Sequence, residues 1–287
     1  MLTNFDGGTT DQFAVSLDKA WYDGWAQGLG FNLSYTYTDA TEQNPGTSSV
    51  ALSNFNGVVT SDPNNPAVAR SNYAFDNVFK LNLTYDRAFF GDYRTRVNLF
   101  AQHRSGRRFS YAFAQSAATL FGENVTSQRQ LFYVPRTDGS GQVTRTSDPI
   151  VTYAAAFDLA AFNSYLERTG LIDHAGQIAP RNGFESPDFT TVDLYIEQEL
   201  PAFFPGGARL ALYGTVENIG NLINDEWGVL QQIGGSSTDV VAVNCQVTSC
   251  VAGRGNFYQY NSLSQDTAGS FSGASVWQAK FGVKYRF

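Results

Sequence analysis

The sequence predicts an all-β fold: a transmembrane antiparallel β-barrel segment of about seven long strands, forming an open or incomplete barrel with long extracellular loops and one short loop helix. Three observations predict it. Of the 287 residues, 16% are charged and 15% are aromatic, yet the mean hydropathy is only −0.24. This balance is expected when one face of each strand contacts lipid and the other contacts water. Apolar and polar residues also alternate in long runs, and short and long connections alternate between the runs.

Six segments upstream of the C-terminus alternate between apolar and polar residues and predict six strands. In chain order they are Phe13–Asp18, Phe31–Thr38, Phe79–Asp86, Arg96–Gln102, Val192–Glu197 and Arg209–Glu217. Side chains of a strand point alternately to its two faces, so each segment is expected to have one apolar and one polar face.

The seventh strand, at Val276–Phe287 (VWQAKFGVKYRF), has the clearest pattern. Every second residue from Trp277 to Phe287 is aromatic or aliphatic, and the residues between them are Gln, Lys, Gly or Arg. Globular strands average about five or six residues, so a strand of this length suits a tilted crossing of a bilayer.

Seven is an odd number of strands, whereas single-chain bacterial barrels have an even number. Met1–Thr10 shows no alternation that would supply an eighth strand, so we expect an open wall whose first and last strands do not pair. The first twelve residues also lack the basic and apolar regions of a signal peptide.

Short and long connections alternate between these strands. The short links Tyr22–Gln27, Phe89–Asp92 and Pro201–Gly207 carry the Gly, Pro and Asp residues typical of turns. The long connections are the polar stretches Thr41–Asn72, Ser105–Asp188 and Asn218–Gly273. Outer-membrane barrels have short periplasmic turns and long extracellular loops. We therefore expect the cell outer membrane of a Gram-negative bacterium, with the long connections extracellular.

The long connections contain predicted structure of their own. Tyr153–Thr169 (YAAAFDLAAFNSYLERT) has the pattern of an amphipathic helix that ends at Gly170. Short alternating runs within Ser237–Leu263 predict a hairpin above the membrane.

A soluble β-sandwich is the main alternative fold, because its strands also alternate. Its strands are shorter, however, and its turns recur about every 8–12 residues. A bundle of transmembrane helices is excluded, because the longest nearly uncharged apolar stretch, Tyr153–Phe162, falls far short of the roughly 20 residues a spanning helix needs. The net charge of −7 argues against nucleic acid as a partner.

The end of the chain resembles a known signal. Alternating residues that finish in a terminal phenylalanine, here Phe281, Val283, Tyr285 and Phe287, resemble the signature recognised by the outer-membrane barrel assembly machinery. Val216–Gly228 (VENIGNLINDEWG) resembles the penultimate strand and following loop of TonB-dependent receptors, specifically the Oar-like branch. Further segments similar to this branch are Ile178–Pro187 (IAPRNGFESP) and Val192–Phe204 (VDLYIEQELPAFF), and the resemblance extends from about Asn72 onward.

The resemblance implies that residues 1–287 are the C-terminal part of a receptor β-barrel, with the plug domain and the N-terminal strands absent. Complete barrels of this kind have about 22 strands and a plugged lumen. The implied function is a receptor or transporter that binds a ligand at its extracellular loops for energised uptake or export. The implied partners are outer-membrane lipid and lipopolysaccharide, the barrel assembly machinery, and the TonB complex through the missing N-terminal part.

A structural or adhesive outer-membrane β-protein without active transport is the alternative function. The sequence leaves the ligand open: a siderophore, a peptide, a glycan or an exported protein would all be compatible with it. No cofactor is expected.

No catalytic or metal-binding constellation is visible, so we do not expect an enzyme. His103 and His174 lie far apart in the chain, with no Cys or His at ligand spacing nearby. Asp225 and Glu226 are adjacent, and side chains at consecutive extended positions diverge. We therefore do not expect these two carboxylates to act together as a general acid and a general base.

Charged residues suggest two candidate sites. Arg104, Arg107 and Arg108 lie where a strand is expected to leave the membrane, as a candidate contact for an anionic ligand or a lipopolysaccharide phosphate. The simpler interpretation is that these arginines are hydrated side chains at the rim of the barrel and bind no ligand. On the polar side of the strands, charge pairs are expected between the row Gln278, Lys280, Lys284 and Arg286 and the row Asp193, Glu197, Glu199, Arg209 and Glu217.

The two cysteines, Cys245 and Cys250, lie close together in one polar segment. This spacing predicts a local disulfide and an oxidising compartment. A pair of free thiols is the alternative.

Overall fold

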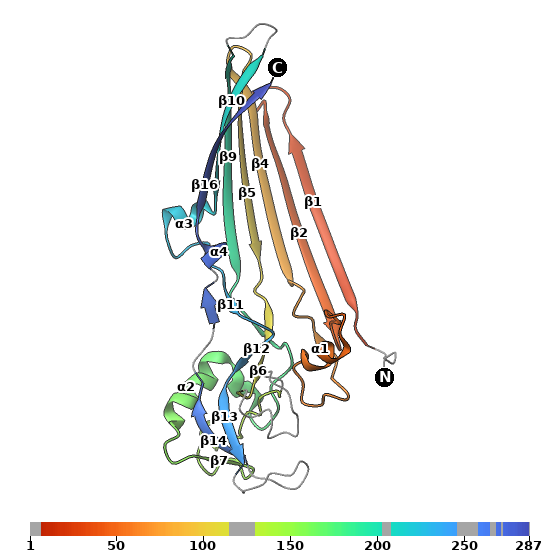
Figure 1. Cartoon of the computed structure of the whole chain (residues 1–287), viewed down its shortest axis with the longest axis vertical. Helices are drawn as coiled ribbons and strands as arrows, with labels where there is room; N and C mark the ends of the chain where they lie inside the picture. The colour runs from red at the N-terminus through yellow and green to blue at the C-terminus, as the bar shows by residue number, and fades with distance from the viewer. Residues whose placement is uncertain are drawn as a thin grey trace.

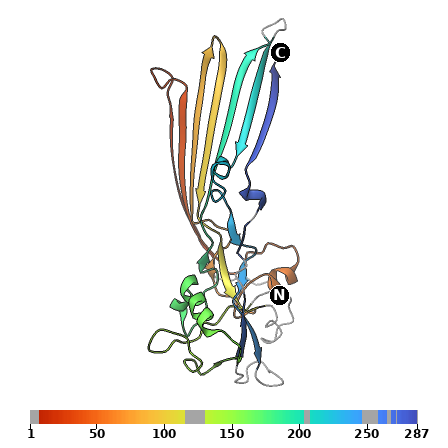
Figure 2. The ribbon, with the colours of Figure 1, turned by 90° about the vertical axis from the view of Figure 1, so that its left-hand side faces the viewer.

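The computed structural model describes residues 7–114, 130–202, 208–245, 258–264, 268–270 and 272–286. The chain is all-β with a few short helices, and it is elongated (Figure 1). One end is a single antiparallel sheet of long strands, and much of the long connections gathers at the other end (Figures 1 and 2). We call these regions the sheet and the loop unit, the latter formed by residues 105–114, 130–188, 231–245 and 258–264.

The sheet contains seven long strands that lie side by side in chain order. They are β1 (Thr10–Ala20), β2 (Leu29–Glu42), β4 (Asn77–Phe90), β5 (Tyr93–Arg104), β9 (Phe189–Pro201), β10 (Arg209–Glu217) and β16 (Gln278–Arg286). The short strand β3 (Ala69–Arg70) pairs with the end of β2. Each of the first six predicted segments lies within one strand, whereas the last strand begins two residues later than predicted. Among the described residues, β1 and β16 each pair with one long neighbour and not with each other.

The register places one kind of side chain on each face of the sheet. One row of paired residues crosses all seven strands: Lys19, Phe31, Leu83, Leu99, Leu194, Val216 and Ala279. The adjacent row is Ala20, Gly30, Thr84, Asn98, Tyr195, Thr215 and Lys280. We call the face of the first row the apolar face and that of the second the polar face. Large side chains on the apolar face are exposed: Leu17 by 59%, Leu83 by 37% and Phe281 by 83%.

The same row shows that the strands are staggered. It begins at Lys19, next to the short-link end of β1, and finishes at Ala279, next to the opposite end of β16. The sheet is also curved, because its strands remain spread out in two perpendicular views (Figures 1 and 2). Stagger and curvature together are the geometry that a barrel wall requires.

Glycines shape the short links. Gly91, with a φ of 60°, and Asp92 alone separate β4 from β5. In the link between β1 and β2, Gly28 has a φ of 88°, and a Cβ there would lie 2.2 Å from the carbonyl oxygen of Asp86. A side chain at Gly28 would therefore clash with β4, so this turn requires glycine.

The loop unit consists of short strands and two helical segments. They are β6 (Arg108–Ala112), β7 (Val151–Tyr153), α2 (Leu159–Thr169), the 3₁₀ helix η2 (Leu171–His174), β8 (Phe184–Glu185), β11 (Gln231–Ile233), β12 (Ser237–Asp239), β13 (Val241–Cys245) and β14 (Tyr258–Leu263). Outside this unit lie α1 (Ala51–Asn56), α3 (Ile219–Ile223), β15 (Ala268–Ser270) and α4 (Ser272–Ser275). None of the described helices is long and apolar enough to cross a membrane.

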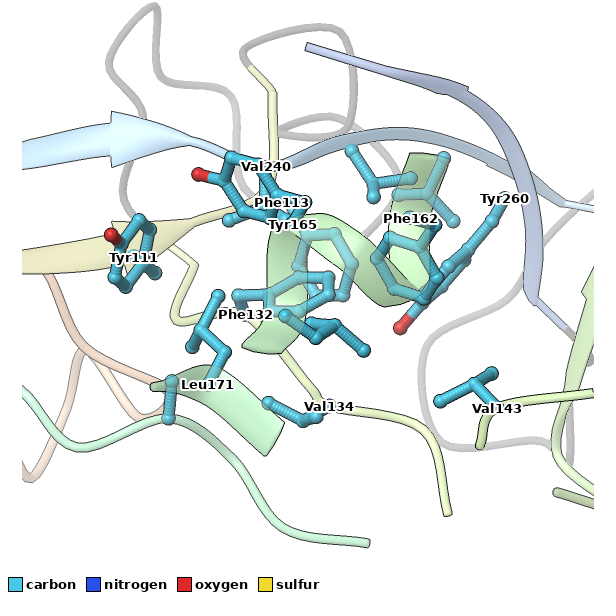
Figure 3. Packing of buried hydrophobic residues seen from close by; sticks show 14 of the residues in the cluster. Tyr111, Phe113, Phe132, Val134, Val143, Phe162, Tyr165, Leu171, Val240 and Tyr260 are labelled. Carbon is cyan, nitrogen blue, oxygen red and sulfur yellow. The ribbon is translucent and has the colours of Figure 1, made fainter. Parts of the chain in front are cut away.

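The hydrophobic core lies in the loop unit and not in the sheet. Its centre is a group of aromatic rings from β14, α2 and the segments that follow β6 (Figure 3). Phe132 packs edge-to-face on Phe113 at 5.3 Å between ring centroids, and Phe162 packs edge-to-face on Tyr260 at 6.3 Å. Such pairs stabilise a core beyond the area that they bury. The long connections therefore fold into a compact body with its own core.

The loop helix is shorter than the sequence predicts. Helix α2 begins at Leu159, because the side chain of Asp158 accepts a backbone hydrogen bond and caps it, and it ends at Gly170 as predicted. Tyr153 instead belongs to β7 and pairs in parallel with Tyr260. The predicted start at Tyr153 is wrong, because the cap and the strand pairing override the apolar periodicity.

The antiparallel pairing predicted within Ser237–Leu263 is confirmed, since β13 pairs with β14 in that orientation, while the place of this hairpin above a membrane stays a prediction. Two parallel pairings were not predicted: β14 with β7, and β12 with β6. Both join segments that are far apart in the chain, so local alternation contains no information about them.

Candidate functional site

Two buried glutamates form the centre of a charge network on the polar face. Glu197 and Glu199 of β9 are only 2% and 4% exposed. Arg96 of β5 bridges them: its Nη1 donates to Glu197, and its Nη2 lies 3.0 Å from Glu199 Oε1. A buried carboxylate requires a paired cation or several donors. The planar fork of one arginine serves both carboxylates here.

The network extends to β10 and β16. Arg209 and Arg286 reach Glu199 at 3.1 Å and 3.5 Å. Nearer the loop unit, Lys280 Nζ lies 2.7 Å from Glu217 Oε1. Four neighbouring strands, β5, β9, β10 and β16, are therefore joined by ion pairs on one face of the sheet.

Lys284 is held by aromatic side chains as well as by charge. Its Nζ lies 2.6 Å from Glu197 Oε2, 2.7 Å from the Tyr195 hydroxyl and 4.7 Å from the centroid of the Tyr213 ring. Gly282 is the strand partner of Tyr213, and a Cβ at Gly282 would lie 2.4 Å from that ring. The glycine thus leaves room for the ring that supports Lys284.

The predicted charge pairing between the two rows is confirmed for Lys280, Lys284 and Arg286, whereas Arg209 pairs with Glu199 of its own row. Asp193 differs from the prediction, because it accepts a hydrogen bond from the backbone N–H of Asn218 at 2.7 Å. The central role of Arg96 was missed. Its place in the polar row was visible in the sequence, but its partners depend on β5 pairing with β9 across the longest connection.

The structure gives separate partners to the three arginines of the predicted anionic contact. The Arg104 guanidinium lies 4.1 Å from the centroid of the Phe75 ring. Arg107 Nε donates to a backbone carbonyl of the connection before β4, at 3.0 Å. Arg108 pairs with Asp76. These contacts within the chain favour a structural role for the cluster.

Asp76 ties the sheet to the loop unit. It lies just before β4, with its side chain 11% exposed, and it binds Arg70 of β3 at 2.8 Å and Arg108 of β6. Burial by itself raises the pKa of Asp76, but hydrogen bonds and attraction from Arg108 and Arg70 outweigh burial. The pKa of this carboxyl therefore lies below its ordinary value.

We expect this junction to loosen in acid. A carboxyl with a lowered folded-state pKa contributes stability that is present above its unfolded pKa of about 3.9 and is lost as pH falls through the folded value. The protection of amides in residues 69–76 and 105–112 against hydrogen exchange, relative to the unstructured rate at the same pH, should therefore fall below about pH 4. Asp76→Asn should lower this protection at neutral pH and abolish the acid step, whereas the exposed control Asp225→Asn should change neither. An acid step that persists in Asp76→Asn would contradict this assignment.

The loop unit contains a hollow of about 430 Å³. Phe109, Tyr111 and Phe184 contribute apolar lining, and Arg168 and Glu185 contribute polar groups. Burial raises the pKa of Glu185, against the opposing attraction of Arg108. A concave site of this size with mixed lining suits a small organic ligand.

The remaining predicted residues do not form a site together. His103 Nδ1 lies 2.8 Å from Thr190 Oγ1 at the end of the sheet, whereas His174 packs on a ring of the loop unit. Within the described ranges, no group of three or more His, Cys, Asp or Glu side chains could hold a metal ion. Cys245 ends β13, but Cys250 lies outside the described residues, so the disulfide stays a prediction.

The fold and the two faces define a class of protein: one long, staggered antiparallel sheet with an exposed apolar face, joined to a compact loop unit. No protein-family model matches the chain, and no curated protein or solved structure matches it either. The resemblance to Oar-like receptors is therefore carried only by the segments quoted above.

Proposed function

We propose that this chain is part of the wall of an outer-membrane β-barrel, in a receptor or transporter of the TonB-dependent, Oar-like kind. The two-faced sheet is the observation that carries the proposal. Six of the seven strands expose large apolar side chains on one face, namely β1, β2, β4, β9, β10 and β16, while ion pairs join strands on the other. A soluble sheet buries its apolar face beneath a second layer of structure. Among the described residues no such layer covers this face, and lipid would cover it in a membrane.

The edges of the sheet support the same proposal. A strand edge in lipid leaves unpaired backbone groups that each cost several kcal/mol. β1 and β16 each have one free long edge among the described residues. In a membrane both edges would pair with further strands and complete the barrel.

The C-terminal residues fit recognition by the barrel assembly machinery. Phe281, Val283 and Tyr285 all lie on the apolar face and are exposed. Phe287, the last residue of the signature, lies outside the described residues.

In this proposal the loop unit is extracellular and binds the ligand, with the hollow beside Phe109 and Phe184 as the candidate pocket. The polar face lines the lumen, where its charge network would meet a plug, and the TonB complex supplies energy through that plug. We propose neither an enzymatic activity nor a cofactor.

A structural or adhesive outer-membrane protein is the second candidate. It is favoured by the aromatic core of the loop unit, which makes a rigid surface suited to contact with a partner. The full reading frame separates the two: a plug domain with a TonB box favours transport. Ligand uptake that stops when the proton gradient is dissipated would further favour transport.

The membrane location is tested by fractionation and protease treatment of intact cells. We expect the chain in the outer-membrane fraction, extractable only with detergent. Protease added outside the cells should cut within residues 130–188 and spare the sheet. A chain that stays monomeric, folded and soluble without detergent would contradict the proposal.

A further inference from the structure

We propose that the short-link rim of the apolar face binds the phosphate group of anionic phospholipids through two cation–aromatic pairs. The pairs are Lys19 with Trp21 and Arg87 with Phe89. Lys19 Nζ lies 5.7 Å from the centroid of the Trp21 ring, and the guanidinium carbon of Arg87 lies 6.0 Å from that of Phe89. This inference rests on the proposed membrane function, and it names the lipid that this part of the surface would select.

Both pairs belong to a band of two aromatic groups that crosses β1, β2 and β4, with Leu29 between the groups. The Trp21 ring lies 6.0 Å from that of Phe31, and the Phe89 ring lies 5.9 Å from that of Tyr85. Leu29 connects the two halves, because its carbonyl accepts a hydrogen bond from the Trp21 N–H and its strand partner is Tyr85. The band ends at the short links, so it marks one boundary of the apolar face. Aromatic rings at such a boundary lie at the level of lipid headgroups.

The two cations are available for a ligand. Lys19 and Arg87 are exposed, and no ion pair joins either of them to a carboxylate in the described part of the chain. The acids next to them in the strands, Asp18 and Asp86, belong to the polar face and are engaged there. Asp18 accepts a hydrogen bond from Asn32 at 2.6 Å, and Asp86 pairs with arginines of β5.

This availability distinguishes the rim from the arginine cluster at the other end of the strands. Arg104, Arg107 and Arg108 are held by partners within the chain, as described above. Among the described residues, the partners recorded for the Lys19 and Arg87 cations are rings, which hold each cation at headgroup level and leave its N–H groups able to donate. A phosphate oxygen accepts charge-assisted hydrogen bonds from such groups.

The chemistry favours an anionic phospholipid over a zwitterionic one. A headgroup such as phosphatidylglycerol has a net negative charge, whereas the amine of phosphatidylethanolamine competes for its own phosphate. Because this rim adjoins the short links, the proposed orientation places it in the periplasmic leaflet, which consists of phospholipid. Lipopolysaccharide, in the opposite leaflet, is therefore not the occupant proposed here.

The experiment uses the full chain in detergent micelles, with retained lipid counted by native mass spectrometry. We expect phosphatidylglycerol to be retained about 30-fold better than phosphatidylethanolamine, the size of effect that two cations near a lipid surface provide at about 1 kcal/mol each. Lys19→Gln combined with Arg87→Gln should abolish this preference. The matched control, Lys80→Gln combined with Lys280→Gln, removes two cations of the polar face and should preserve it.

The outcomes separate this inference from the membrane function. Equal retention of the two lipids, or loss of the preference in both double variants, would overturn the rim site while leaving the barrel wall intact. A chain that does not enter bilayers of either lipid would overturn the membrane function, and the rim site with it.

Discussion

Replacing Leu83 with arginine should lower the free energy of unfolding in a bilayer by about 2–4 kcal/mol, because the guanidinium would enter the hydrocarbon near its midplane. Leu83 lies in the middle of β4, on the apolar face, between Phe31 and Leu99 of the neighbouring strands. The measurement is urea-induced unfolding in lipid vesicles, followed by tryptophan fluorescence.

Asn82→Arg is the matched control, because the same residue type is introduced one position away at the same depth. Asn82 lies on the polar face, where its Oδ1 accepts a hydrogen bond from Asn98 at 2.6 Å. Its replacement loses that bond, at a cost of about 1 kcal/mol, and exposes no charge to lipid. Equal losses for Leu83→Arg and Asn82→Arg would contradict the assignment of the two faces.

Replacing Arg96 with methionine should destabilise the sheet by about 3 kcal/mol or more, because two buried carboxylates lose their shared cation. Glu197 and Glu199 are almost completely buried, and Arg96 is the group that bridges them. Their remaining ion pairs come from β10 and β16, so β5 would keep only the backbone N–H of Arg94 as a donor to Glu199 and would lose its ion pairs with β9. Equilibrium unfolding in detergent or vesicles measures the loss.

Arg94→Met is the control for this substitution. The Arg94 side chain is 53% exposed and pairs with Asp86 at 3.1 Å. An exposed pair contributes about 1 kcal/mol at most, so the expected loss is small. Adding Glu197→Gln and Glu199→Gln to Arg96→Met should restore part of the stability, since no uncompensated charge then stays buried. Equal losses for Arg94→Met and Arg96→Met would show that the network is not buried in the folded protein.

The strands of the sheet were predictable, because side chains point alternately to an apolar and a polar face, which gives the sequence a period of two. In Phe79–Asp86 the alternation gives both the strand and the identity of each face, and the register confirms the faces. The charge pairs of β16 with β9 and β10 were predictable for the same reason, since one polar row was expected to face another.

The loop unit was not predictable from local pattern. Its core brings together rings such as Phe132 and Tyr260, and its parallel pairings join distant segments. The start of α2 had a local signal, because Asp158 is a good N-cap residue, but the apolar run before it was more conspicuous. Arg104, Arg107 and Arg108 are close in the sequence and therefore suggested one site, but each side chain contacts a different partner.

The central claim, that the apolar face contacts lipid, is tested most directly by spin labels along β4. Single cysteines at residues 79 to 85, in a chain with Cys245→Ser and Cys250→Ser, would be labelled and reconstituted in vesicles. Collision rates with oxygen, which dissolves in lipid, and with a water-soluble nickel complex are then compared. We predict a period of two, with oxygen favoured at Phe79, Leu81, Leu83 and Tyr85 and nickel favoured at the residues between them. Equal access for both reagents along the strand, or alternation with the opposite phase, would contradict the claim.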